Sequence, residues 1–176
     1  MRNNHQSRNV VLTGFMGTGK STVGVILAEI LVKEFVDTDT MIEQIRGPIP
    51  EIFKNEGEEA FRQYEREISE QLKLKENLVI ATGGKLLLDQ TNVELLGANG
   101  RIFCLSAPID QIIERILKEG RPKRPLLDSD DFEERLREIY SQRVSSYSVF
   151  EQVDTAGRTP SEIAAEISNR LLPEEK

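Results

Sequence analysis

Residues 14–21 read Gly-Phe-Met-Gly-Thr-Gly-Lys-Ser, and this stretch decides the fold class. It matches the pattern Gly-x-x-x-x-Gly-Lys-Ser/Thr in full, with an apolar strand expected before it and an amphipathic helix after it. Glycines admit backbone angles that other residues avoid, so successive N–H groups can surround phosphate oxygens. The pattern therefore predicts an ATP-binding loop, against the alternative of a glycine turn in which Lys20 and Ser21 are incidental.

Two side chains of this loop are expected to act on the nucleotide. Lys20 is predicted to reach the β- and γ-phosphates as a point charge, and the Ser21 hydroxyl to bind the Mg²⁺ that bridges the same oxygens. The helix that begins in the loop directs the positive end of its dipole at the anion. The residues predicted to bind the nucleotide here are Gly14, Gly17, Thr18, Gly19, Lys20, Ser21 and Thr22.

Short β-branched runs alternate with longer helical patterns, which favours a parallel sheet covered on both faces. The predicted strands are 10–13, 35–37, 78–82, 101–105 and 152–155. The predicted helices are 20–34, 50–75 with a break near Gly57, 108–118, 131–148 and a last helix capped by Thr159. We predict a three-layer α/β fold of the P-loop NTPase type, similar to nucleoside monophosphate kinases, with a central parallel five-stranded sheet flanked by helices.

The composition narrows the class of protein. With 176 residues, 38% of them hydrophobic and 30% charged, the chain is expected to form one domain over 1–176, with its core at about 9–172. A net charge of −7 argues against a broad nucleic-acid surface. No apolar run is long enough to span a bilayer, and Cys104, the single cysteine, lies in an apolar run typical of a core strand. We expect a cytoplasmic monomer that binds a small molecule and neither nucleic acid nor membrane.

Asp37 and Asp39 stand at the end of the second predicted strand. Many proteins with such a phosphate loop use a strand-end carboxylate for Mg²⁺, and the third predicted strand ends without one. We therefore assign Asp37 to the magnesium shell, directly or through water, and Asp39 to the acceptor hydroxyl as base or orienting group. The alternative is that Asp39 or Thr38 only caps a helix that begins at Thr40.

Taken in order, these motifs resemble the shikimate kinase family over nearly the whole chain. The matching blocks are 14–22, 35–39 with Ile42 and Glu43, 57–62 with Glu65, 81–84, 124–127, Arg143 four residues before Tyr147, and 153–155. The resemblance implies transfer of the γ-phosphoryl group of MgATP to the 3-hydroxyl of shikimate, a step toward chorismate and the aromatic amino acids. It also implies a substrate-binding helical segment at about 38–76 and a lid at about 119–131.

The resemblance assigns roles to individual residues of the acceptor site. The residues that correspond to shikimate-binding positions are Asp39, Arg62, Gly83, Gly84 and Arg143. Two arginines suit this task because they can bind a carboxylate through paired, charge-assisted hydrogen bonds. Without the resemblance, Arg62 and Arg143 are typical exposed helix residues. Glu65 is either an orienting partner of an arginine or a direct contact.

The stretch 119–125 holds two prolines, a glycine and three cations, and predicts a mobile basic flap. By resemblance, its Arg124 is the lid arginine that closes over ATP and stabilises the transferring phosphoryl group, which makes it catalytic together with Lys20 and Asp39. Arg158 falls where the family places a residue beside adenine, with simple solvation as the alternative.

Two features depart from the family's pattern. Lys85 stands where the family usually has a third glycine, and it either adds a cation for the acceptor carboxylate or blocks the acid and selects another substrate. The flap is lengthened before Arg124, so Arg115 and Arg121 are both candidates for the residue against adenine. Two alternatives therefore stay open: a kinase for another small metabolite such as a sugar acid, and a nucleotide-binding module without turnover.

Overall fold

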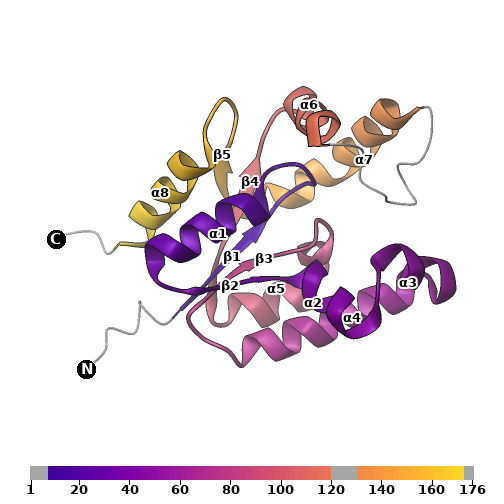
Figure 1. The fold of residues 1–176 in the computed structure, drawn as a ribbon, viewed down its shortest axis with the longest axis horizontal. Helices are drawn as coiled ribbons and strands as arrows, with labels where there is room; N and C mark the ends of the chain where they lie inside the picture. The colour runs from indigo at the N-terminus through magenta and orange to yellow at the C-terminus, as the bar shows by residue number, and fades with distance from the viewer. Residues whose placement is uncertain (1–7, 120–130, 173–176) are drawn as a thin grey trace.

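The computed structural model describes residues 8–119 and 131–172, and Figure 1 shows how its elements are arranged. One sheet of five parallel strands has the order β2-β3-β1-β4-β5. The strands are β1 (Asn9–Thr13), β2 (Glu34–Asp37), β3 (Leu78–Ala81), β4 (Gly100–Ser106) and β5 (Glu151–Asp154). Each predicted strand is found within one residue at either end, so the predicted parallel α/β fold is confirmed.

Helices connect the strands. They are α1 (Lys20–Leu31), α2 (Thr38–Arg46), α3 (Ile49–Asn55), α4 (Gly57–Lys73), the 3₁₀ turn η1 (Leu86–Leu88), α5 (Gln90–Gly97), α6 (Ile109–Glu119), α7 (Phe132–Tyr147) and α8 (Pro160–Leu171). The predicted break near Gly57 separates α3 from α4. The predicted cap of α8 is also present, since the Thr159 N–H donates to Glu162 Oε2 at 2.7 Å and the Glu162 N–H to Thr159 Oγ1 at 3.3 Å. The turn η1 and helix α5 were not predicted.

The first helix ends earlier than the predicted Glu34. Val32 takes a left-handed backbone with φ 54°, and the Lys33 N–H returns to the Ala28 carbonyl at 2.9 Å. Glu34 then pairs with the strand next to it, opposite Leu78. Strand pairing therefore captures a residue that the helical apolar spacing alone had placed in α1.

The sheet packs against helices on both faces, and successive residues of β1 alternate between them. Val10 and Leu12 belong to the core under α1 and α8, whereas Val11 belongs to the core that α2, α3, α4 and α5 cover. A third cluster joins α6 and α7 to Phe15, and it contains Cys104, only 1% exposed, as predicted for a core residue. In the described part of the chain, no helix is both long and apolar enough to cross a membrane.

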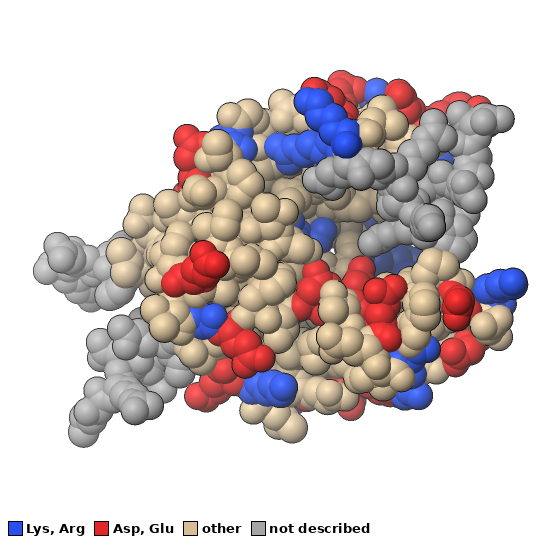
Figure 2. Space-filling view, viewed as in Figure 1, with Lys and Arg blue, Asp and Glu red and all other residues tan. Residues whose placement is uncertain are grey.

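All five strands run parallel, so their carboxyl ends meet at one edge of the sheet. The loops after β1, β2 and β3 leave the sheet at this edge, which is where ligands bind in open α/β sheets. Figure 2 shows a hollow in the middle of this face, with acidic side chains on its α2 side and basic ones on its α6 side. The flap 120–130, including Arg124 and Arg121, lies outside the described residues.

Candidate active site

The loop after β1 has the backbone geometry of an anion cradle. Gly14, Gly17 and Gly19 have φ values of 130°, 74° and 93°, which favour glycine. A Cβ at Gly14 would also lie 2.3 Å from the Leu105 carbonyl oxygen, so no other residue fits there. Lys20 Nζ donates to the carbonyl oxygens of Gly14 at 2.8 Å and Phe15 at 3.0 Å. The loop therefore holds its own cation at the start of α1, in position to meet a phosphate.

Ser21 and Asp37 meet beside this loop. Ser21 Oγ donates to Asp37 Oδ2 at 2.7 Å, and Asp37 Oδ1 accepts the N–H groups of Asp39 at 3.0 Å and Thr40 at 3.3 Å. A hydroxyl and a carboxylate this close suit Mg²⁺, which takes few protein ligands and completes its shell with water and phosphate oxygens. In residues 8–119 and 131–172, no group of three or more His, Cys, Asp and Glu side chains offers another metal site.

The same contacts decide the helix cap. The helix begins at Thr38 and not at Thr40, and Asp37 is its N-cap because Asp37 has an extended backbone and accepts the first free N–H groups. The alternative that Asp39 or Thr38 caps this helix is therefore wrong. The buried Thr38 hydroxyl instead accepts the Gly83 N–H at 2.9 Å, which joins α2 to the loop after β3. The Asp39 carboxylate does not cap the helix.

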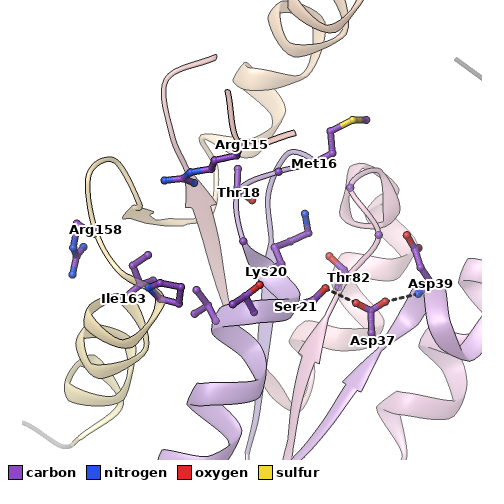
Figure 3. A pocket seen from close by; sticks show the side chains of 17 residues that line it. Met16, Thr18, Lys20, Ser21, Asp37, Asp39, Thr82, Arg115, Arg158 and Ile163 are labelled. Carbon is purple, nitrogen blue, oxygen red and sulfur yellow. Dashed lines mark hydrogen bonds between the residues drawn. The ribbon is translucent and has the colours of Figure 1, made fainter. Parts of the chain in front are cut away.

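A cavity of about 460 Å³ lies over the phosphate loop. Its lining combines the loop with both aspartates and residues of the adjoining strand ends, namely Met16, Gly17, Thr18, Gly19, Lys20, Ser21, Thr22, Val23, Asp37, Asp39, Thr82, Gly83, Gly84, Arg115, Arg158, Pro160 and Ile163. In Figure 3, Asp37 and Asp39 lie on one side of Lys20, and Arg115 and Arg158 on the other. A cavity of this size suits a nucleotide with a small second substrate.

The Arg115 side of the cavity offers a surface for a flat base. Arg115 donates to the buried Thr155 through Nη1 to Oγ1 at 3.0 Å and through Nη2 to the carbonyl oxygen at 2.7 Å. Arg158 is bound to its own helix region, with Nη1 2.9 Å from the Asp154 carbonyl oxygen and 2.5 Å from Glu166 Oε2. Of the two arginines proposed to lie against adenine, Arg115 thus lines the cavity, whereas Arg121 lies outside the described residues.

On the opposite side, Asp39 packs against the loop after β3. A Cβ placed on Gly83 would lie 2.5 Å from Asp39 Oδ1 and 3.3 Å from Glu65 Oε1, so both carboxylates closely approach this glycine. Glu65 is only 2% exposed. Burial raises the pKa of Glu65 to about 7, and the charge of Asp39 adds to the shift, whereas Arg62 opposes it.

Arg62 is held by two glutamates at the rim of this site. Its Nη1 donates to Glu65 Oε2 at 2.6 Å, and its Nε and Nη2 donate to Glu58 Oε1 at 3.3 and 3.1 Å. Lys85 Nζ donates to the same Glu58 oxygen at 2.6 Å. The acceptor side therefore carries a network of two cations and two carboxyl groups, with Arg62 at its centre.

Helix α7 closes the acceptor side from above β4. Tyr147 is buried, and its hydroxyl donates to the Gly84 carbonyl oxygen. Burial raises the pKa of Tyr147 to about 12, and the guanidinium of Arg143, one helical turn earlier, acts in the opposite direction. Arg143 and Tyr147 thus reach the same loop as Asp39, from a different element.

Comparison with known proteins decides the family. The family model described as "Shikimate kinase" matches residues 16–172. This chain belongs to the shikimate kinase family. A shikimate kinase from Thermodesulfovibrio yellowstonii is 42% identical over 162 residues, which cover 91% of this chain and 92% of that protein.

Solved structures agree with the family. Shikimate kinase from Acinetobacter baumannii, in complex with shikimate, matches with a TM-score of 0.86 and 34% identity over 94% of this chain and 93% of that one. A gluconokinase from Sinorhizobium meliloti matches with a TM-score of 0.64 and 20% identity over 94% of this chain and 91% of that one, which shows a common fold alone. Membership in the shikimate kinase family implies ATP with Mg²⁺ as phosphoryl donor.

The structure brings most of the predicted site residues to one edge of the sheet, and the cavity adds several that were not predicted. Arg62 and Arg143 lie behind the lining, next to Glu65 and Tyr147, and Arg124 is outside the described residues. Pro160 and Ile163 were missed, although the cap at Thr159 already indicated that α8 begins beside the phosphate loop. Glu58 was missed because only the fold shows that it lies next to Lys85.

Proposed function

We propose that this chain transfers the γ-phosphoryl group of MgATP to the 3-hydroxyl of shikimate. One observation carries the proposal: Asp39 lines the same cavity as Lys20 and Ser21. A group that can take a hydroxyl proton therefore faces the groups that would hold the triphosphate. Membership in the shikimate kinase family supports the same reaction.

On the donor side, the loop glycines and Thr18 would hold the phosphate oxygens. Lys20 would leave the carbonyl oxygens of Gly14 and Phe15, to which it now donates, for the β- and γ-phosphate oxygens. Ser21 and Asp37 would hold Mg²⁺, which neutralises charge on the phosphates when it is bound. Arg115, with Pro160 and Ile163, would lie beside the base, and Arg158 beyond them.

On the acceptor side, Arg62 and Arg143 would bind the carboxylate of shikimate. Arg62 fits this role because its guanidinium has five N–H groups and the two glutamates engage three of its nitrogen atoms with one N–H each. The turn at Gly83 and Gly84 lines the cavity next to Asp39, where a small polyhydroxylated ring can approach the backbone closely. Asp39 would accept the hydrogen bond of the reacting hydroxyl.

The chemical step is an in-line displacement. The shikimate oxygen attacks the γ-phosphorus, the bond between that phosphorus and the bridging oxygen of ADP breaks, and Asp39 takes the hydroxyl proton. Lys20 stabilises the charge that develops on the transferring group. Arg124 would assist from the lid by the family resemblance, and closure of residues 119–131 would exclude water from the reaction.

We further propose that the chain acts as a cytoplasmic monomer. Every described residue assigned to the site comes from one chain, from the loops after β1, β2 and β3 and from α4, α6, α7 and α8. Light scattering after size-exclusion chromatography, with and without substrates, tests the monomer. A dimer that persists at assay concentrations would contradict it.

A coupled assay of ADP release with wild type and Asp39→Asn tests the proposed function. The wild type should release ADP only when shikimate and MgATP are both present. The Asp39→Asn variant should lose about 10²- to 10⁴-fold in kcat, because the amide cannot take the proton. A variant with full turnover would leave the reaction in place and remove the assigned base.

A panel of acceptors separates the two alternatives. Saturable turnover with gluconate and none with shikimate would favour a sugar-acid kinase. ATP binding without ADP release for any acceptor would favour a nucleotide-binding module. Retention of Asp39 and of both arginines argues against the second alternative, since a module that only binds nucleotide has no use for them.

A further inference from the structure

Lys85 connects the loop after β3 to the first turn of α4. Its Nζ donates to Glu58 Oε1 at 2.6 Å, and Arg62 Nη2 donates to the same oxygen at 3.1 Å. The Lys85 contact is the largest cause of the lowered pKa of Glu58, followed by the contact from Arg62. One carboxylate thus binds two cations, and only one of them, Arg62, is assigned to the acceptor.

The place of Lys85 decides between the two roles that the sequence leaves open. The cavity lining includes Gly83 and Gly84, whereas Lys85 is not part of it. The ammonium group is directed to Glu58, so the side chain does not block the acceptor site in this conformation. Its side chain is 39% exposed and that of Glu58 is 51% exposed, which places the pair at the rim.

The charges around Arg62 give this pair a function. Without Lys85, a single arginine would face two glutamates, and the local charge would be zero or negative depending on whether Glu65 is protonated. An acceptor carboxylate would then meet little or no net attraction. With Lys85, the two cations balance Glu58 and Glu65, and they exceed them by one charge when Glu65 is protonated.

We propose that Lys85 is a specificity-determining residue that neutralises Glu58, so that the positive charge of Arg62 remains available to the carboxylate of the acceptor. Lys85 is a positioning residue in this role, because it acts through Glu58 and does not touch the acceptor. The inference rests on the proposed function and extends it: the chain selects an acceptor with a carboxylate partly through a lysine outside the cavity.

A double-mutant cycle of Lys85→Met and Glu58→Gln tests this role. With MgATP saturating, Lys85→Met should raise KM for shikimate about threefold to tenfold and leave kcat and KM for MgATP unchanged, as expected for the loss of a partly exposed charge. In the Glu58→Gln background, the same change should have no effect on KM, because no glutamate charge is left to neutralise. Lys85→Arg should keep the wild-type KM.

Lys73→Met is the matched control. Lys73 is an exposed residue in the last turn of α4, so its loss makes the same change of net charge on the element that carries Glu58 and Arg62, at the opposite end. It should leave KM for shikimate unchanged. A thermal unfolding curve for each variant confirms that the proteins compared are folded, and Lys85→Gly provides a second test in which no long side chain remains.

Three outcomes would overturn the inference. An unchanged KM in Lys85→Met and Lys85→Gly would show that the lysine has no role. An equal rise in KM in both backgrounds would show that Lys85 acts on the acceptor by itself and not through Glu58. A wild type without shikimate-dependent ADP release would remove the proposed function and this role with it, whereas the first two outcomes leave the proposed function intact.

Discussion

The donor side and the acceptor side of the cavity are built from different materials. On the donor side, backbone groups of residues 14–21 form the site, and close packing fixes them: a Cβ would lie 2.3 Å from the Leu105 carbonyl oxygen at Gly14 and 2.9 Å from Ile116 Cγ1 at Gly17. On the acceptor side, long side chains form the site, and they hold one another through shared hydrogen bonds among Arg62, Glu58, Glu65 and Lys85.

This difference separates reaction class from substrate choice. A backbone cradle can only bind phosphate, so substitutions there are expected to remove turnover. A network of side chains can be changed one charge at a time, so substitutions there are expected to change KM for the acceptor first. Each prediction below tests that division.

The largest effect is expected from Lys20→Met on the donor side. The variant loses the cation that the loop directs at the β- and γ-phosphates, and kcat should fall about 10²- to 10³-fold, as for removal of one group that stabilises the transition state. KM for shikimate should change little. Steady-state ADP release at saturating shikimate measures both. If KM for shikimate rose as strongly as kcat fell, the two sides would not be separable.

The next effect is expected from Gly83→Ala, at the boundary between the two sides. The new Cβ would lie 2.5 Å from Asp39 Oδ1, so the carboxylate must move and the geometry of proton transfer is lost. We expect kcat/KM for shikimate to fall about 10- to 100-fold. The binding of MgATP, measured by calorimetry, should not change.

Gly97→Ala is the control for Gly83→Ala. Its Cβ would lie 3.7 Å from Ile102 Cδ1, which is an ordinary contact, at the exposed end of α5. This variant should keep the wild-type kinetics. Equal losses in the two variants would show that a general loss of stability, and not displacement of Asp39, explains the effect.

The donor side could be predicted from sequence, whereas the acceptor side could be predicted only in part. Residues 14–21 encode a local backbone shape, so the pattern alone predicts which groups face the phosphate. The contact between Glu58 and Lys85 spans 27 residues and depends on how α4 packs beside the loop after β3. No spacing along the chain reveals such a contact.

Short elements were the other source of error. The turn η1 and helix α5 were missed because three and eight residues give too little periodicity to recognise. One signal was available, since Asp89 accepts the Thr91 N–H at 2.9 Å as an N-cap residue. The start of α2 was placed two residues late, which hid the fact that Asp37 both caps the helix and binds Ser21.

A smaller effect is expected from Arg62→Lys on the acceptor side. Lysine keeps the charge but cannot make paired hydrogen bonds, so KM for shikimate should rise about tenfold while kcat stays within a factor of two or three. Arg66→Lys, one turn further along α4, is the matched control, because Arg66 bonds Asp89 at 2.8 Å away from the cavity. A similar KM in both variants would remove Arg62 from the acceptor site.

The smallest effect is expected from pH, and it also belongs to the acceptor side. Glu65 has a pKa of about 7, so it is mostly protonated below pH 7 and ionised above it. Ionisation adds a negative charge 2.6 Å from Arg62 Nη1 and weakens the attraction between Arg62 and the acceptor carboxylate. KM for shikimate should therefore rise about threefold between pH 6 and pH 8, an effect in the range of a partly screened charge. Initial rates at saturating MgATP, checked at each pH, measure this change, and Glu65→Gln should abolish it because glutamine does not titrate. A slope that survives in Glu65→Gln would assign the pH dependence to another group and would make the acceptor side as insensitive to pH in this range as the backbone cradle on the donor side.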